Sequence, residues 1–148
     1  MPSPTPQLDL QYLVLEGTFP SEGGWIGDDP DPEKPAGREV IEVLLKGVDP
    51  SLPDSELWVE EEYGWSFNCK VDGVTVNVLI QFVDHWLVIL HVVSFKPRFL
   101  RGPKYGAAVL EIARRIHQAL QRDARTESLS WMAATEYIAF SSSPRTGG

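Results

Sequence analysis

Cysteine is almost absent from this 148-residue sequence, and it lacks both a signal peptide and the common nucleotide-binding motifs. A single cysteine, Cys69, cannot form an intramolecular disulfide, so a disulfide-stapled secreted scaffold is excluded. The opening residues "MPSPTPQLDL" contain neither the basic nor the apolar segment of a signal peptide. The phosphate-binding patterns GxGxxG and GxxxxGKS/T do not occur. We therefore expect a cytoplasmic protein without a nucleotide-binding loop.

Uninterrupted apolar runs long enough for a membrane span are also missing. The longest candidate, "VTVNVLIQFVDHWLVILHVVSF" at residues 74–95, carries Asp84 and His85 at its middle. A membrane helix needs about 20 predominantly apolar residues. A charged side chain at its centre costs about 2.5–3.5 kcal/mol on insertion. The sequence therefore predicts no membrane-spanning segment.

The same stretch alternates in polarity with a period of two, which is typical of β-strands. It is rich in valine, isoleucine and phenylalanine, whose side chains fit a pleated surface. We predict strands over residues 74–83 and 86–95. A strand over residues 65–71 precedes the pair Asp72-Gly73, which favours a tight hairpin because both positions accept positive φ. Together these strands predict a three-stranded antiparallel meander.

Loop lengths fix which side chains share a face of this meander. A two-residue loop after residue 71 pairs Cys69 with Val76 on the core face. A two-residue loop at residues 84–85 places His91 on the same face, opposite Val78, whereas a three-residue loop would move it. The other face is too apolar for one in contact with water. We expect the rest of the chain to cover it, or else a partner, for example a second copy in a homodimer through this outer face.

Two helices are predicted by apolar residues that recur at steps of three and four. The longer, in residues 102–123, begins near Pro103, whose missing N–H would be unpaired there anyway. The shorter covers residues 36–47. Residues 8–17 suit a strand, and residues 127–140 fit either a strand or a short helix.

The predicted fold class is therefore α+β. An antiparallel meander over about residues 57–95, with an added N-terminal strand, packs against the long C-terminal helix, and the shorter helix precedes the meander. Residues 1–148 are expected to form one domain. Three segments are expected to be flexible: the N-terminus 1–6, the acidic loop 18–36 and the C-terminal tail 141–148.

The net charge of −8 is unevenly placed along the chain. Residues 1–62 contain fifteen Asp/Glu and three Lys/Arg, while residues 63–148 contain six and ten. An acidic surface confers solubility, opposes nucleic acid and anionic lipid, and suits a basic protein partner. The candidate partner-binding residues combine this charge with aromatic anchors. They are Trp25, Asp28, Asp29, Asp31, Trp58, Glu60 and Glu62.

A small-ligand site or an enzyme is the alternative, with a pocket between the sheet and the long helix. Its candidate residues are Cys69, His91, Arg98, Arg101 and Lys104. We predict no catalytic residue, cofactor or metal site. The three histidines lack HxH or HxxxH spacing, and a core cysteine usually behaves as a small hydrophobe. The acidic loop lacks the glycine that a calcium-binding EF-hand loop requires.

The segments "YGWSF", "VDGVTVNVLIQF" and "HWLVILHVV", followed by a long amphipathic helix and "LSW", resemble small bacterial α+β proteins. In shape and charge the sequence is similar to immunity proteins of polymorphic toxin systems. The resemblance covers residues 57–131 and transfers no functional residue. It implies a non-catalytic cytoplasmic protein whose acidic N-terminal surface neutralises a basic toxin. An acidic secretion chaperone, which would dimerise through the outer sheet face, is a further alternative.

Overall fold

The computed structural model describes residues 10–20, 23, 25–30, 35–60, 64–83, 85–94, 96 and 102–142. Their elements are β1 Leu10–Gly17, β2 Trp25–Ile26, β3 Asp29–Pro30, α1 Arg38–Val48, the 3₁₀ turn η1 Asp54–Glu56, β4 Trp58–Glu60, β5 Gly64–Val71, β6 Val74–Phe82, β7 Trp86–Val93, α2 Pro103–Gln121, β8 Thr126–Met132 and α3 Ala134–Ser142. The predicted flexible terminus 1–6 and residues 143–148 of the predicted tail lie outside the described residues.

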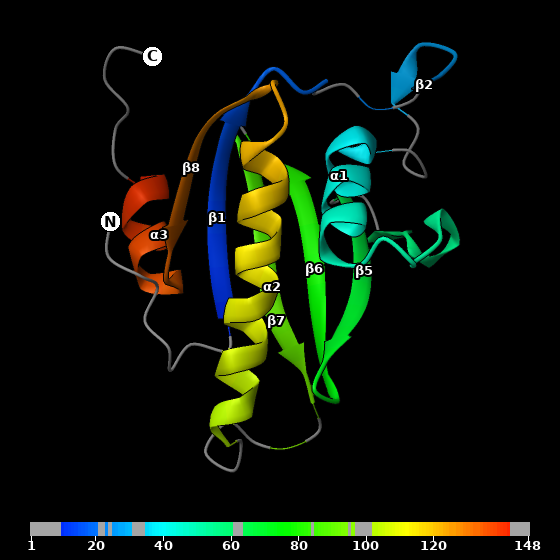
Figure 1. Cartoon of the computed structure of the whole chain (residues 1–148). Coiled ribbons are helices and arrows are strands. Elements are labelled where there is room, and N and C mark those ends of the chain that lie inside the picture. The colour runs from blue at the N-terminus through cyan, green and yellow to red at the C-terminus, as the bar shows by residue number, and fades with distance from the viewer. Residues whose placement is uncertain are drawn as a thin grey trace.

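A six-stranded antiparallel sheet organises the molecule, with strand order β4-β5-β6-β7-β1-β8. The predicted meander is confirmed as β4 to β7, and the N-terminal strand joins it as β1, between β7 and β8. Helices α1 and α2 lie side by side across one face, which we call the inner face (Figure 1). The fold class is α+β, as predicted.

The inner face buries the apolar positions of the predicted periodicities. From α1 the core takes Val40, Ile41, Leu44 and Leu45, all of them fully buried. From α2 it takes Val109, Ile112, Ile116 and Leu120, which recur at steps of three and four. Burying such side chains contributes about 1.5–3 kcal/mol each. The amphipathic stripes therefore determine which side of each helix meets the sheet.

The two hairpins of the meander differ in loop length. Asp72 and Gly73 both have positive φ, 50° and 77°, so the first loop has two residues and the predicted pairing of Cys69 with Val76 is confirmed. The second loop has three residues, because Phe82 pairs with Trp86.

The predicted register of the second hairpin is therefore wrong by one residue. His91 pairs with Asn77 and lies exposed on the outer face, away from the core. A one-residue slip exchanges the two faces of a strand. The observed register buries Trp86, Val88, Leu90 and Val92 on the inner face, so the core contains four apolar side chains from β7 and no histidine.

The C-terminal region contains both structures that the sequence left open. Residues 126–132 form β8, which pairs with β1, and residues 134–142 form α3. The change occurs at Ala133, whose backbone N–H donates to Glu136 Oε1 at 3.0 Å, an N-terminal capping contact. Within the predicted acidic loop 18–36, β2 and β3 form a short ribbon that turns at Gly27 with φ of 62°.

Candidate functional site

Strand β4 forms one edge of the sheet and exposes an aromatic side chain. Trp58 pairs with Ser66, so its side chain projects from the outer face, on the side opposite α1 and α2. The Trp58 side chain is 38% exposed. Immediately before it, η1 places the carboxylates of Asp54 and Glu56 at the surface. An exposed indole and two surface carboxylates therefore lie within five residues of one another along the chain.

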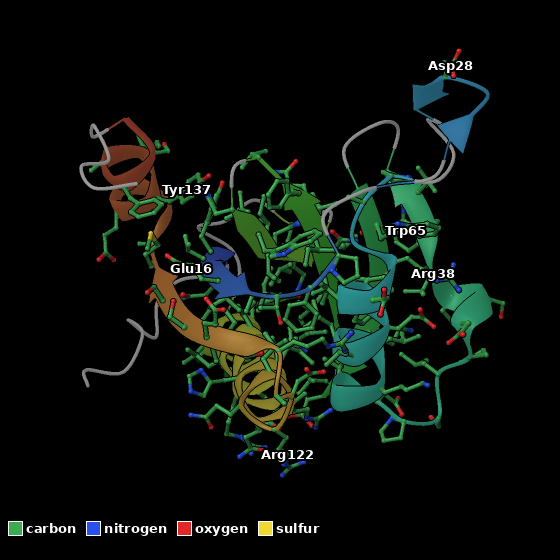
Figure 2. The ribbon with its side chains drawn as sticks, turned by 90° about the horizontal axis from the view of Figure 1, so that it is seen from above. Glu16, Asp28, Arg38, Trp65, Arg122 and Tyr137 are labelled. Carbon is green, nitrogen blue, oxygen red and sulfur yellow. The ribbon has the colours of Figure 1, made fainter. Side chains whose placement is uncertain are left out.

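Arg38, at the start of α1, connects this edge to the rest of the fold. Its guanidinium lies 4.8 Å from the centre of the Trp65 ring and forms ion pairs with Glu42 at 3.5 Å and Asp54 at 3.8 Å. The Trp65 Nε1–H donates to the Pro35 carbonyl at 2.9 Å. Figure 2 shows Arg38 and Trp65 close together, with Asp28 farther out on the ribbon. One arginine thus positions η1 and offsets part of its negative charge.

A row of polar side chains crosses β5 and β6 on the outer face. Asn77 Nδ2 donates to Ser66 Oγ at 2.8 Å and to Asn68 Oδ1 at 3.0 Å. Ser66 Oγ–H donates in turn to the Val78 carbonyl at 3.0 Å. Ser66 and Asn77 are buried, whereas Asn68 is exposed. We call Asp54, Glu56, Trp58, Asn68 and Asn77 together the edge surface.

The predicted partner-binding residues fall into two groups. Trp58 and Glu60 begin and end β4. Trp25, Asp28 and Asp29 belong to the β2–β3 ribbon, where Asp28 is exposed in the turn. Figure 1 shows this ribbon on the α1 side of the molecule. Two further candidates, Asp31 and Glu62, lie outside the described residues.

The structure separates Cys69 and His91, the two central residues of the predicted alternative pocket. Cys69 lies on the inner face and His91 on the outer face, so the sheet separates them and the predicted shared face is wrong. Burial raises the pKa of the Cys69 thiol to about 12, which keeps the thiol protonated and non-nucleophilic. Lys104 is exposed in the first turn of α2, its ammonium 5.7 Å from the Tyr105 ring centre. Arg98 and Arg101 lie outside the described residues.

A second charged cluster joins the α2–β8 turn to α1. Arg125 donates to Asp123 Oδ2 at 2.8 Å and to Glu39 Oε1 at 3.0 Å, and its guanidinium lies 4.6 Å from the Phe19 ring centre. The hydrogen bonds from Arg125 lower the pKa of Asp123 to about 2. The Arg125 guanidinium contacts both carboxylates and the Phe19 ring, so we assign this cluster a role in stabilising the fold.

Neither a group of metal ligands nor a membrane-spanning helix occurs in the part of the chain that the structure describes. No three His, Cys, Asp or Glu side chains among these residues are grouped as a metal site would require. None of the described helices is both long and apolar enough to cross a membrane.

Sequence reasoning missed the polar row of the edge surface. Ser66, Asn68 and Asn77 looked like ordinary polar positions of alternating strands. The available signal was that two asparagines are placed symmetrically about the Asp72-Gly73 turn, which makes them direct cross-strand partners. Asn77 pairs with Asn68 in the register that the turn imposes.

Comparisons with known proteins add no relative: a scan against protein-family models and searches of curated proteins and of solved structures found no match.

Proposed function

We propose that this protein is a non-catalytic cytoplasmic binding module that holds a basic protein partner against the edge surface. The observation that carries the proposal is the exposure of Trp58 on an edge strand that follows the surface carboxylates of Asp54 and Glu56 in the chain. Tryptophan is enriched among the residues that dominate interface energies. A large indole that is 38% exposed, in a segment that also carries surface carboxylates, suits a partner with both apolar and basic groups.

Charge and hydrogen bonding serve different purposes on this surface. The fifteen acidic residues of the N-terminal 62 attract a basic partner over a distance and raise its association rate. At contact, the exposed Asn68 amide offers a donor and an acceptor of fixed direction, because Asn77 holds its Oδ1. The indole then supplies apolar area at the centre. Recognition would thus be steric and electrostatic, with no bond made or broken.

Neutralisation of a basic toxin is the form of binding that we favour, since it needs only an acidic surface that covers the partner's functional groups. A secretion chaperone that dimerises through the outer sheet face is less favoured. Helix α3 already occupies the part of that face over β1 and β8 (Figure 2). A small-ligand pocket is not proposed, because Cys69 and His91 lie on opposite faces.

The test is a pull-down from the lysate of the protein's own host, with the wild-type chain, Trp58→Ala and Val93→Ala as baits. Val93→Ala is the matched control, because it removes an apolar side chain that is 46% exposed on β7, which β5 and β6 separate from the strand of Trp58. We expect a stoichiometric basic protein on wild type and Val93→Ala. Washing at high salt should release it, because screening weakens exposed charge pairs.

Trp58→Ala should weaken binding of that protein by 10-fold or more, equivalent to at least about 1.4 kcal/mol. The double variant Asp54→Asn/Glu56→Gln should mainly slow association and flatten the salt dependence. Equal capture by wild type and Trp58→Ala would contradict the proposed site. A bait that captures no basic protein even at low salt would contradict the proposed function.

A further inference from the structure

Strand β4 covers only part of the length of β5. Strand β5 has eight residues, Gly64–Val71, but β4 pairs with residues 64–66 alone. Beyond Ser66, no described strand pairs with β5 on the side away from β6. In Figure 1 no described helix or strand lies on that side of the end of β5 that leads into β6. We call residues 67–71 the open segment of β5.

The hairpin with β6 determines where the main-chain groups of the open segment point. A two-residue turn closes with a hydrogen-bonded pair of residues, here Val71 and Val74. Such pairs alternate with non-hydrogen-bonded ones along an antiparallel ladder, so Asn68 and Lys70 direct their N–H and C=O groups away from β6. Both residues are exposed, and no described segment outside the sheet makes a backbone hydrogen bond to them. The open segment therefore presents two donors and two acceptors along one edge.

Acidic side chains flank the open segment. Asp49, the C-cap of α1, lies close enough to Cys69 for its charge to raise the pKa of that thiol. Hydrogen bonds from Ser51 lower the pKa of Asp49, so this carboxylate is ionised at neutral pH. Asp72 is exposed and follows the segment directly, while the basic side chain within it, Lys70, projects from the outer face, opposite to Cys69. With the two carboxylates of η1 nearby in the chain, the balance of charge favours a basic occupant.

We propose that the basic partner contributes an extended segment that pairs with the open segment of β5 as an added β-strand. Main-chain hydrogen bonds to Asn68 and Lys70 set the register of the added strand, and its basic side chains meet the flanking carboxylates. A second copy of the chain is a poor occupant, because each copy carries a net charge of −8 and the same carboxylates. This inference rests on the proposed function and adds that the partner is held by its backbone as well as by its charge.

A synthetic peptide of four Lys-Val repeats probes the open segment without the natural partner. A peptide of four Lys-Pro repeats is the matched control: it has the same charge and is extended, but proline has no N–H and disrupts a ladder. Fluorescence anisotropy at one salt concentration should show at least 10-fold tighter binding of the Lys-Val peptide. Equal affinities would overturn strand pairing, because charge alone would then explain the binding, and absence of binding even at low salt would overturn it as well.

Amide hydrogen exchange reads the same contact residue by residue. In the free protein the amides of Asn68 and Lys70 should exchange at least 10-fold faster than those of Phe67 and Cys69, which point to β6. Saturating Lys-Val peptide should slow exchange at Asn68 and Lys70 by 10-fold or more and leave Cys69 unchanged. No protection by the peptide would overturn the proposal. Protection that rises with protein concentration in the absence of peptide would also overturn it, since a second copy would then occupy the edge.

Two substitutions of Lys70 separate its main-chain N–H from its charge. Lys70→Pro removes the outward N–H, which takes no part in the ladder with β6, and proline is accepted at such edge positions. Lys70→Thr removes the same charge but keeps the N–H and suits a strand. Lys70→Pro should weaken binding of the Lys-Val peptide at least 10-fold, whereas Lys70→Thr should strengthen it, because a like charge is removed. Equal binding by the two variants would contradict strand pairing. Circular dichroism checks that Lys70→Pro folds, and if it does not, the two peptides on the wild-type chain decide the question.

The same variants, used as baits in the pull-down, distinguish this inference from the proposed function. Strand pairing requires that Lys70→Pro captures much less of the basic protein than Lys70→Thr does. If both variants capture it fully while Trp58→Ala loses it, strand pairing is wrong and the proposed function stands. If wild type captures no basic protein, the proposed function is wrong, and strand pairing by a natural partner falls with it.

Discussion

Cys69 shows how strongly position in a sheet sets the chemistry of a single side chain. Its Sγ–H points to the Val76 carbonyl, 3.5 Å away, and the residue is 6% exposed. Desolvation by burial is the largest cause of the rise in its pKa to about 12; the charge of Arg115 lowers this pKa and that of Asp49 raises it, both to a smaller extent. The thiol is therefore a core group, and its reactivity reports on unfolding.

We predict that Cys69 makes stability fall as the pH rises. In the unfolded chain the thiol titrates near pH 8.5, whereas in the folded chain it stays protonated to about pH 12. Above pH 8.5 the unfolded state binds fewer protons, so the free energy of unfolding decreases, by about 1 kcal/mol between pH 8 and 9.5. Below pH 8 the contribution of Cys69 to the free energy of unfolding is constant.

Urea denaturation of wild type and Cys69→Val at the two pH values measures this effect. The decrease should be about 1 kcal/mol larger for wild type, because the variant has no thiol to ionise. A thiol reagent such as DTNB should leave native Cys69 unmodified at pH 8 and modify it in urea. Rapid modification of the native protein would contradict the assigned burial.

The contact between α1 and α2 depends on a glycine. A Cβ placed on Gly47 would overlap the Cβ of Ala119, which has no freedom to move aside. Alanine favours a helix over glycine by about 1 kcal/mol. Overpacking in a close-packed interior costs about 1–3 kcal/mol and should outweigh that gain. The absence of a side chain at residue 47 thus lets two helices lie side by side on the inner face.

We predict that Gly47→Ala destabilises the protein by about 1–2 kcal/mol and that Ala119→Gly relieves the clash. Urea unfolding of the two single variants and of the double variant completes the cycle. The double variant should be more stable than the sum of the single changes implies, with a coupling of about 1–3 kcal/mol. Strictly additive effects would show that the helices do not meet at this pair.

At the scale of the whole molecule, the described residues form one core cluster, between the inner face of the sheet and the helices α1 and α2. We predict a single cooperative unfolding transition of that core, with calorimetric and van't Hoff enthalpies in agreement. For 148 residues the enthalpy near 60 °C should be about 100 kcal/mol. Differential scanning calorimetry checks this prediction. Two resolved transitions would mean that β1 and β8 unfold separately from the meander.

The candidate site was only partly predictable from the sequence. The aromatic and acidic content of β4 can be read directly, because an apolar residue beside a carboxylate run is a local signal. The polar row on β5 and β6 could be predicted only once the register of the hairpin that joins these strands was known. The stacking of Tyr12 on Tyr137 could not be predicted even from a hairpin register, because these residues are far apart in the chain and no local period relates them.

By itself the sequence determined the longer strands and helices up to α2, but it left residues 127–140 open between strand and helix. Periods of two and of 3.6 residues are local properties, and burial of the resulting apolar stripe explains α1, α2 and the meander. Only the tertiary structure decided that β1 inserts between β7 and β8, that His91 faces outward, and that α3 packs against β1 and β8. These depend on loop length and on pairing between distant segments. Their free energies come from packing that only the assembled sheet provides.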